Sequence, residues 1–136
     1  MPAQNNEFPW MSYYGHYRFF EDRMLSHNKV YSIQNIGEGL YEIDLGAGRV
    51  IKVFICECYS FGLAEYYEAV EKLGEIQSVI INSNWCGYTI DAKRYCREHG
   101  IGLFSIGEFM AALNMKNFWE YLTKQEIEYF KEKGWL

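Results

Sequence analysis

The chain has 136 residues, which is enough for one domain with a single hydrophobic core. Hydrophobic residues make up 49% of it and charged residues 23%, a balance that excludes an intrinsically disordered protein, and no apolar run is long enough to span a membrane. Eighteen acidic residues against thirteen basic ones give a net charge of −5, which argues against tight DNA binding by a monomer, because phosphate neutralisation supplies most of the affinity of nucleic-acid binders.

The first part of the chain is expected to supply an arm, a helix and two short strands. Residues 1–10 contain both prolines and are predicted to be extended. Aromatic and methionine side chains recur at helical spacing over residues 11–25, which predicts a first helix there. The two strands that follow are separated by Gly37-Glu38-Gly39, and the second of them, Tyr41–Leu45, alternates apolar and acidic residues as a half-buried strand does.

The longest predicted strand is Val50–Tyr59. Its centre, Val53–Cys56, is apolar on both faces, which is typical of a strand that is covered on both sides. We therefore predict that this strand lies in the middle of a sheet. It should run antiparallel to Tyr41–Leu45 and parallel to the short buried strand Ser78–Ile81.

Helices and strands alternate after this point. Apolar residues at helical spacing predict an amphipathic helix over Leu63–Leu73, and Thr89 and Ser105 are candidate caps for two further helices. A short strand over Ile101–Phe104 lies between those two helices. Thr123 begins a capping box for a last helix in the tail. The alternation predicts an α/β fold with right-handed parallel crossovers.

Two carboxylates flank the predicted hairpin and are candidate metal ligands. Asp44 lies at the end of one strand and Glu57 near the end of the next. A hairpin with a tight turn can bring such residues together, and paired carboxylate oxygens suit Mg²⁺. The alternative is that Asp44, like Glu42 two residues earlier, only points to water.

Short motifs extend from this hairpin to residue 113. Asp44 precedes the hairpin and the triplet Glu57-Cys58-Tyr59 lies after it. Later come a strand that ends in Asn82-Ser83, then Thr89 and Ala92, the helix end His99-Gly100-Ile101, and the helix with Gly107-Glu108-Phe109. In this order and spacing, residues 40–113 resemble the PD-(D/E)XK nuclease superfamily, especially its Mrr-type restriction-endonuclease branch.

The resemblance implies a restriction-endonuclease-like three-layer α/β core with a mixed central sheet, extended by N- and C-terminal helices. Residues 1–136 would form a single domain, with an arm and helix over 1–30, the core over 40–113 and a helical extension over 114–136. The implied activity is Mg²⁺-dependent cleavage of DNA. Asp44 and Glu57 would hold the metal ion, and Tyr59 would lie next to the attacking water.

One residue departs from the family's motif. The family has a lysine in the triplet where this chain has Tyr59. That lysine supplies a positive charge where negative charge develops on the phosphate, and tyrosine is neutral near pH 7. We therefore expect weak Mg²⁺ binding at Asp44 and Glu57 with slight or no nuclease activity. The alternative function is a non-catalytic protein-interaction module that keeps the nuclease fold and associates with itself.

The N-terminal segment is unusually aromatic between Trp10 and Phe20. One helix face cannot bury all of these rings. The segment therefore either packs in the core or forms an interface with another protein, and base stacking on nucleic acid is a third alternative. From this excess we predict a homodimer that forms through the aromatic N-terminal segment.

The four cysteines are predicted to be reduced thiols in the core of a cytoplasmic protein. The sequence begins without a secretory signal, and no two cysteines have the CxxC spacing of a zinc site. Cys96 and His99 lie three residues apart on a core-facing helical stripe, which favours packing over a nucleophilic pair.

Overall fold

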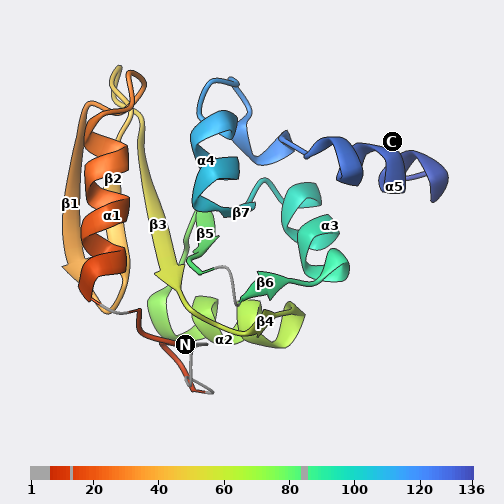
Figure 1. The fold of residues 1–136 in the computed structure, drawn as a ribbon, viewed down its shortest axis with the longest axis horizontal. Helices are drawn as coiled ribbons and strands as arrows, with labels where there is room; N and C mark the ends of the chain where they lie inside the picture. The colour runs from red at the N-terminus through yellow and green to blue at the C-terminus, as the bar shows by residue number, and fades with distance from the viewer. Residues whose placement is uncertain (1–6, 13, 84–85) are drawn as a thin grey trace.

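A mixed sheet of five strands runs through the computed structural model, which describes residues 7–12, 14–83 and 86–136 (Figure 1). Its strands are β1 (Ser32–Gly37), β2 (Leu40–Asp44), β3 (Val50–Cys56), β5 (Ser78–Ile81) and β7 (Gly102–Ser105), and they lie in the order β1-β2-β3-β5-β7. The first three form an antiparallel meander, and β3, β5 and β7 are parallel. The α/β class and the mixed sheet predicted from the sequence are therefore confirmed.

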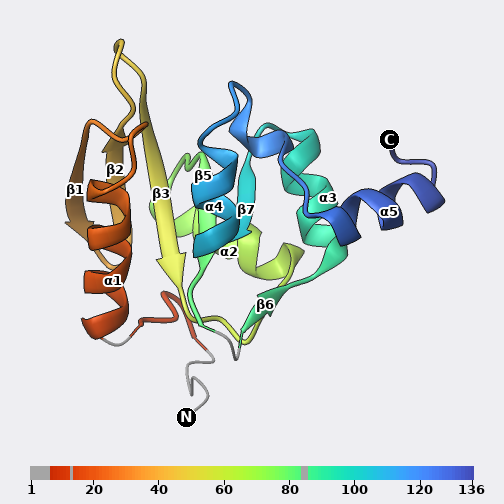
Figure 2. The ribbon, with the colours of Figure 1, turned by 45° about the horizontal axis from the view of Figure 1, so that its top comes forward.

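Helices cover both faces of this sheet. The helices of the described residues are α1 (Tyr14–Leu25), α2 (Leu63–Leu73), α3 (Ile90–Glu98), α4 (Ile106–Ala112) and α5 (Lys124–Glu132), and a 3₁₀ turn lies at Phe118–Glu120. The helices α1 and α4 pack on one face, and α2 and α3 pack on the other (Figures 1 and 2). A separate pair of two-residue strands, β4 (Ser60–Phe61) and β6 (Gly87–Tyr88), joins the loops after β3 and β5.

The strand β3 divides the core in two. Val53 and Ile55 point into the apolar cluster under α1 and α4, whereas Phe54 and Cys56 point into the cluster under α2 and α3. All four side chains are fully buried, which explains why this stretch is apolar on both faces. The predicted central position of this strand, antiparallel to β2 and parallel to β5, is confirmed.

Three helix starts also agree with the sequence. The hydroxyls of Thr89, Ser105 and Thr123 each accept a backbone N–H three residues later, and the last two form complete capping boxes. The end of β3 differs from the prediction, because the strand stops at Cys56 rather than at Tyr59. The chain leaves the sheet there to enter the pair β4–β6, which is too short to give any periodic signal.

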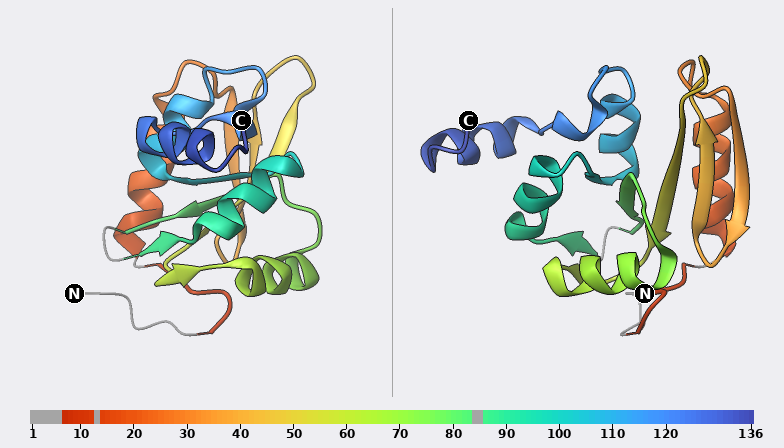
Figure 3. Two further views of the ribbon diagram at one scale, coloured as in Figure 1. Left: turned by 90° about the vertical axis from the view of Figure 1, so that its right-hand side faces the viewer. Right: turned by 180° about the vertical axis from the view of Figure 1, so that it is seen from behind.

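The C-terminal helix α5 lies to one side of the sheet, next to α3 (Figure 3). Arg94 lies 4.1 Å from the ring centroid of Trp135, and Arg97 lies 6.0 Å from that of Phe130. Phe130 is buried in this contact. Among the residues described, no helix is both long and apolar enough to cross a membrane.

The aromatic N-terminal segment is divided between core and surface. Trp10 and Phe20 are buried, while Phe19 is exposed under the guanidinium of Arg23 at 5.0 Å. Tyr13 lies outside the described residues. Some of the aromatic side chains therefore pack in the core, which was one of the interpretations of the sequence.

Candidate functional site

The structure places Asp44 and Glu57 at opposite ends of β3. Asp44 pairs with Val50, the first residue of β3, and Glu57 follows Cys56, the last one. Glu57 lies seven positions after Val50 along extended chain, which is about 20 Å at the usual rise of a strand. The prediction that the hairpin brings the two carboxylates together is therefore wrong, because antiparallel strands place their C-terminal ends at opposite edges of a sheet.

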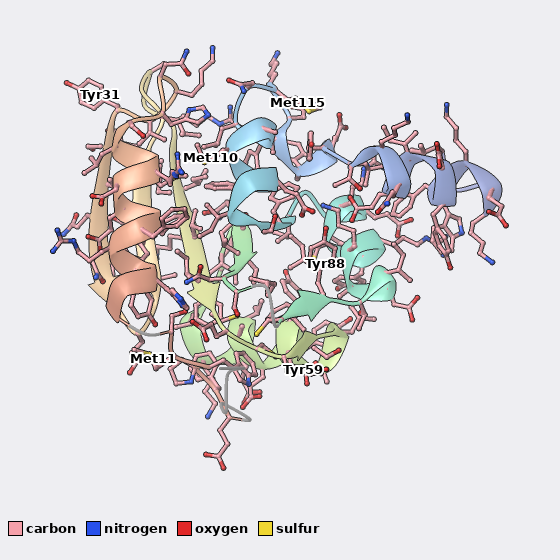
Figure 4. The ribbon with its side chains drawn as sticks, viewed as in Figure 1. Met11, Tyr31, Tyr59, Tyr88, Met110 and Met115 are labelled. Atoms are coloured by element: carbon pink, nitrogen blue, oxygen red, sulfur yellow. The ribbon has the colours of Figure 1, made fainter. Side chains whose placement is uncertain are left out.

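Two labelled tyrosines mark these ends in Figure 4. Tyr31 donates its backbone N–H to the carbonyl of Asp44 at 2.7 Å, and Tyr59 lies two residues after Glu57. The two tyrosines lie far apart in the view, Tyr31 at the upper left and Tyr59 near the bottom. Tyr59 is 66% exposed, so its side chain lies in solvent and not beside a metal pair.

Asp44 has a local structural role. Its carboxylate accepts the backbone N–H of Gly46 at 2.7 Å, a bond that stabilises the turn between β2 and β3. Leu45 and Arg49 close the same turn, because the N–H of Leu45 donates to the carbonyl of Arg49 at 2.8 Å. The half-buried position of Asp44 thus follows from the hairpin itself.

Glu57 is a buried carboxylate with a histidine partner. It is 2% exposed, and its Oε1 is bonded to Nδ1 of His16, which comes from α1. Its backbone N–H donates to the carbonyl of Trp10 at 2.8 Å, so the N-terminal segment continues along the end of β3. A buried carboxylate needs such a partner, because an unpaired charge in the interior is costly.

Further polar side chains gather around this pair, where the parallel strands end. Asn82, directly after β5, is buried and donates from Nδ2 to Oγ of Ser12 at 3.2 Å. The backbone N–H of Ser12 donates to Oη of Tyr17 at 2.9 Å. We call Ser12, His16, Tyr17, Glu57 and Asn82 the carboxyl-edge cluster, since the carboxyl edge of parallel strands is where α/β proteins bind ligands.

The sequence indicates some members of this cluster but not others. Glu57 and Asn82 each follow a short apolar strand directly, and parallel neighbours must end at the same edge. His16 and Ser12 gave no such signal, because they come from a helix and an arm about 40 and 70 residues away from their partners.

Burial keeps the titratable neighbours of the cluster in their protonated forms. It raises the pKa of the Tyr17 hydroxyl, and the negative charge of Glu57 acts in the same direction. Burial raises the pKa of the Cys58 thiol to about 11 and also raises those of Cys56 and Cys86. These cysteines are therefore packed thiols and not activated nucleophiles. The prediction that the cysteines pack in the core is confirmed for Cys56, Cys58 and Cys96.

The residues present do not fit a magnesium centre at Asp44 and Glu57. Mg²⁺ requires near-octahedral oxygen ligands around one point, and these two carboxylates lie at different edges of the sheet. Within the described ranges 7–12, 14–83 and 86–136, no three His, Cys, Asp or Glu side chains are placed to hold a metal ion.

The fold and the cluster together define an α/β protein with a hydrogen-bonded polar site at the carboxyl edge of a mixed sheet. Comparison with family models, with curated proteins and with solved structures gives no match.

Proposed function

We propose that the chain is a non-catalytic interaction module with the restriction-endonuclease-like arrangement, and that it associates with a second copy of itself. The arrangement is supported by the succession of elements. After the antiparallel hairpin β2–β3 come α2, β5, α3, β7 and α4, in the order that the resemblance of residues 40–113 implies.

The separation of Asp44 from Glu57 carries the non-catalytic part of the proposal. A metal-dependent nuclease needs both carboxylates at one point, together with a cation beside the phosphate. Here Asp44 stabilises a turn about 20 Å away, and the carboxylate of Glu57 is bonded to His16. The lysine of the motif is replaced by Tyr59, whose side chain lies in solvent.

We place this self-association at the outer edge of β1 and not on the aromatic N-terminal segment, because Trp10 and Phe20 of that segment are buried in the core. Within the described part of the chain, β1 pairs with β2 on one side only, so its other side presents unpaired backbone N–H and C=O groups (Figure 2). Its sequence, Ser32–Gly37, has neither a charged residue nor a proline to block another strand. Ile36 is 47% exposed on this strand, and Tyr31 just before it is 79% exposed.

Charge favours a second copy at this edge. Residues 14–37, which form α1 and β1, carry three basic and two acidic side chains, so their net charge is +1. The rest of the chain then carries −6. Two copies of an acidic protein repel each other least where the charge is not acidic, and here that is also where a strand edge is open.

A dimer with a two-fold axis would pair the two open strand edges and would bring together the least acidic parts of the two copies. When β1 pairs in antiparallel direction with β1 of the second copy, N–H groups of each strand face C=O groups of the other. Such pairing is related by a two-fold axis, which is the commonest symmetry of dimers. The two five-stranded sheets would become one continuous sheet, and the exposed Phe19 and Leu25 of α1 lie on the helix that packs against this strand.

Sedimentation tests the proposal with two variants that make the same change of charge. We expect the unmodified protein to dimerise at concentrations on the order of tens of micromolar. Ile36→Lys should shift it to monomer, because two-fold symmetry places like charges across the new strand pair. Tyr59→Lys, at an exposed position outside β1, should leave the dimer intact. A monomer at all these concentrations, or a dimer that Ile36→Lys does not weaken, overturns the self-association.

The same proteins test the absence of catalysis. Plasmid DNA with Mg²⁺ or Mn²⁺ should remain uncut by the unmodified protein and by Tyr59→Lys, because the added lysine has no metal pair beside it. Metal-dependent cleavage that disappears in Glu57→Ala would overturn this part of the proposal and return the chain to the nucleases.

A further inference from the structure

A pocket of about 360 Å³ opens between the N-terminal segment, α1 and the turn that joins β1 to β2. Its walls are formed by Met11, Ser12, Tyr17, Asn35 and Glu38, with the backbone of the glycines on either side of Glu38. This volume is at the lower end of the range for small-molecule sites. The pocket adjoins the carboxyl-edge cluster, because Ser12 and Tyr17 belong to both.

The turn that carries Glu38 has an unusual residue for its conformation. Glu38 has φ +56° and Gly39 has φ +83°, so both central residues of the two-residue turn are left-handed. Glycine is required at the second position, because a Cβ there would lie 2.4 Å from the carbonyl oxygen of Ile55. At the first position Asn, Asp or Gly adopts this conformation more easily than glutamate. The conformation of the turn therefore does not explain why a glutamate stands at position 38.

The chemistry of the walls selects a cation. Glu38 supplies the charged side chain of the pocket, and it is negative. Tyr17 holds the opposite wall in place, because its hydroxyl accepts the N–H of Ser12 at 2.9 Å and donates to Sδ of Met11 at 3.5 Å. The aromatic ring and the thioether form an apolar wall against which a cation can lie.

The type of cation follows from the hydrogen bonds. Oδ1 of Asn35 already accepts the N–H of Gly37 at 2.8 Å, and the carbonyl of Gly39 accepts the N–H of Ile55 at 2.8 Å. A primary ammonium has three N–H donors that each need an acceptor, whereas a quaternary ammonium has no N–H group and needs only an apolar wall and a counter-charge. We propose that this pocket binds a small quaternary ammonium compound, with Glu38 as its counter-charge and Tyr17 and Met11 against its methyl groups.

This inference goes beyond the proposed function and does not depend on it, because the pocket lies within one chain. Choline is the probe, and 3,3-dimethylbutan-1-ol is its control, since it has the same shape without the charge. In a titration followed by ¹H–¹⁵N NMR, choline should shift the amide signals of Ser12 and of residues 35–39. We expect the neutral compound to bind at least about tenfold more weakly.

Two substitutions at Glu38 separate lost binding from lost folding. Glu38→Gln should weaken choline at least about tenfold and leave the neutral compound unchanged. Glu38→Asn should remove choline binding while the melting temperature rises, because asparagine suits the turn better. Glu42→Gln makes the same change of charge in the following strand and should leave choline binding intact. Equal binding of both probes, unchanged choline binding in Glu38→Gln, or no signal shift at choline concentrations of tens of millimolar would overturn the inference.

Discussion

Lys93 brings a positive charge into the interior. Its side chain is 1% exposed, its Nζ donates to the carbonyl of Leu103 at 2.7 Å, and the same nitrogen lies 4.0 Å from the ring centroid of Phe104. Burial lowers the pKa of this amine to about 8, although Glu126 and Glu108 act in the opposite direction. The charged form is therefore held at a cost in stability near neutral pH.

This residue predicts how stability depends on pH. An unfolded lysine has a pKa near 10.5, so between about pH 8 and 10.5 the unfolded chain binds more protons at Lys93 than the native chain does. Stability from this residue must rise with pH in that window. Urea unfolding measures the free energy of unfolding of both proteins at pH 7.5 and at pH 10.5. Between these two pH values, that of the unmodified protein should rise by up to about 3 kcal/mol relative to that of Lys93→Met.

The comparison with Lys93→Met removes the contributions that both proteins share. The raised thiol pKa of Cys58 and the raised phenol pKa values act in the opposite direction, since a native state that retains protons loses stability as pH rises. They cancel in the difference between the two proteins. A difference that does not change with pH would show that Lys93 does not titrate as stated.

At the scale of elements, one hydroxyl connects the starts of two helices. Oη of Tyr88, from β6, lies 2.8 Å from Oε1 of Glu108 in α4 and 2.7 Å from Oε2 of Glu126 in α5. Both glutamates also close the capping boxes of their own helices. The docking of α5 beside the core therefore depends on Tyr88 as well as on the stacking of Arg94 on Trp135.

Tyr88→Phe tests this connection. Loss of the hydroxyl should reduce the free energy of unfolding by about 1–2 kcal/mol, because it removes the hydrogen bond that this hydroxyl donates to a glutamate carboxylate. Hydrogen exchange should become faster over Lys124–Glu132 and stay unchanged over Gly102–Ser105. Tyr31→Phe, in an exposed side chain at the far end of the molecule, is the matched control. Equal exchange in α5 of both variants would show that Tyr88 does not hold this helix.

The elements also show what the sequence could predict. Val53–Cys56 had to lie between two layers, because no single-sided strand is apolar at every position, and Thr89, Ser105 and Thr123 are local caps. The carboxyl-edge cluster is harder to predict from the sequence. The bond between His16 and Glu57 joins residues 41 positions apart, so it leaves no local pattern. The separation of Asp44 from Glu57 follows from strand direction alone, since antiparallel β2 and β3 have their C-terminal ends at opposite edges of the sheet.

At the scale of the whole molecule, the distribution of charge makes a prediction about association. The bodies of two copies, each with −6 outside residues 14–37, repel each other across the proposed β1–β1 pair. Salt screens such repulsion with a Debye length of about 10 Å at 0.1 M. Sedimentation should therefore show tighter dimerisation at about 0.5 M NaCl than at about 0.05 M. Weaker dimerisation in salt would indicate attraction between opposite charges instead.

The distance between the two ends of β3 offers a place to attach a label. Residues 46–48 form the turn between β2 and β3, and space is open around Gly46 and Gly48. This turn lies about 20 Å from the pair of His16 and Glu57, at the opposite edge of the sheet. Exposed loop tips accept inserted peptides more readily than other segments do. A fluorophore or affinity tag inserted there would report on the protein without contacting the carboxyl-edge cluster.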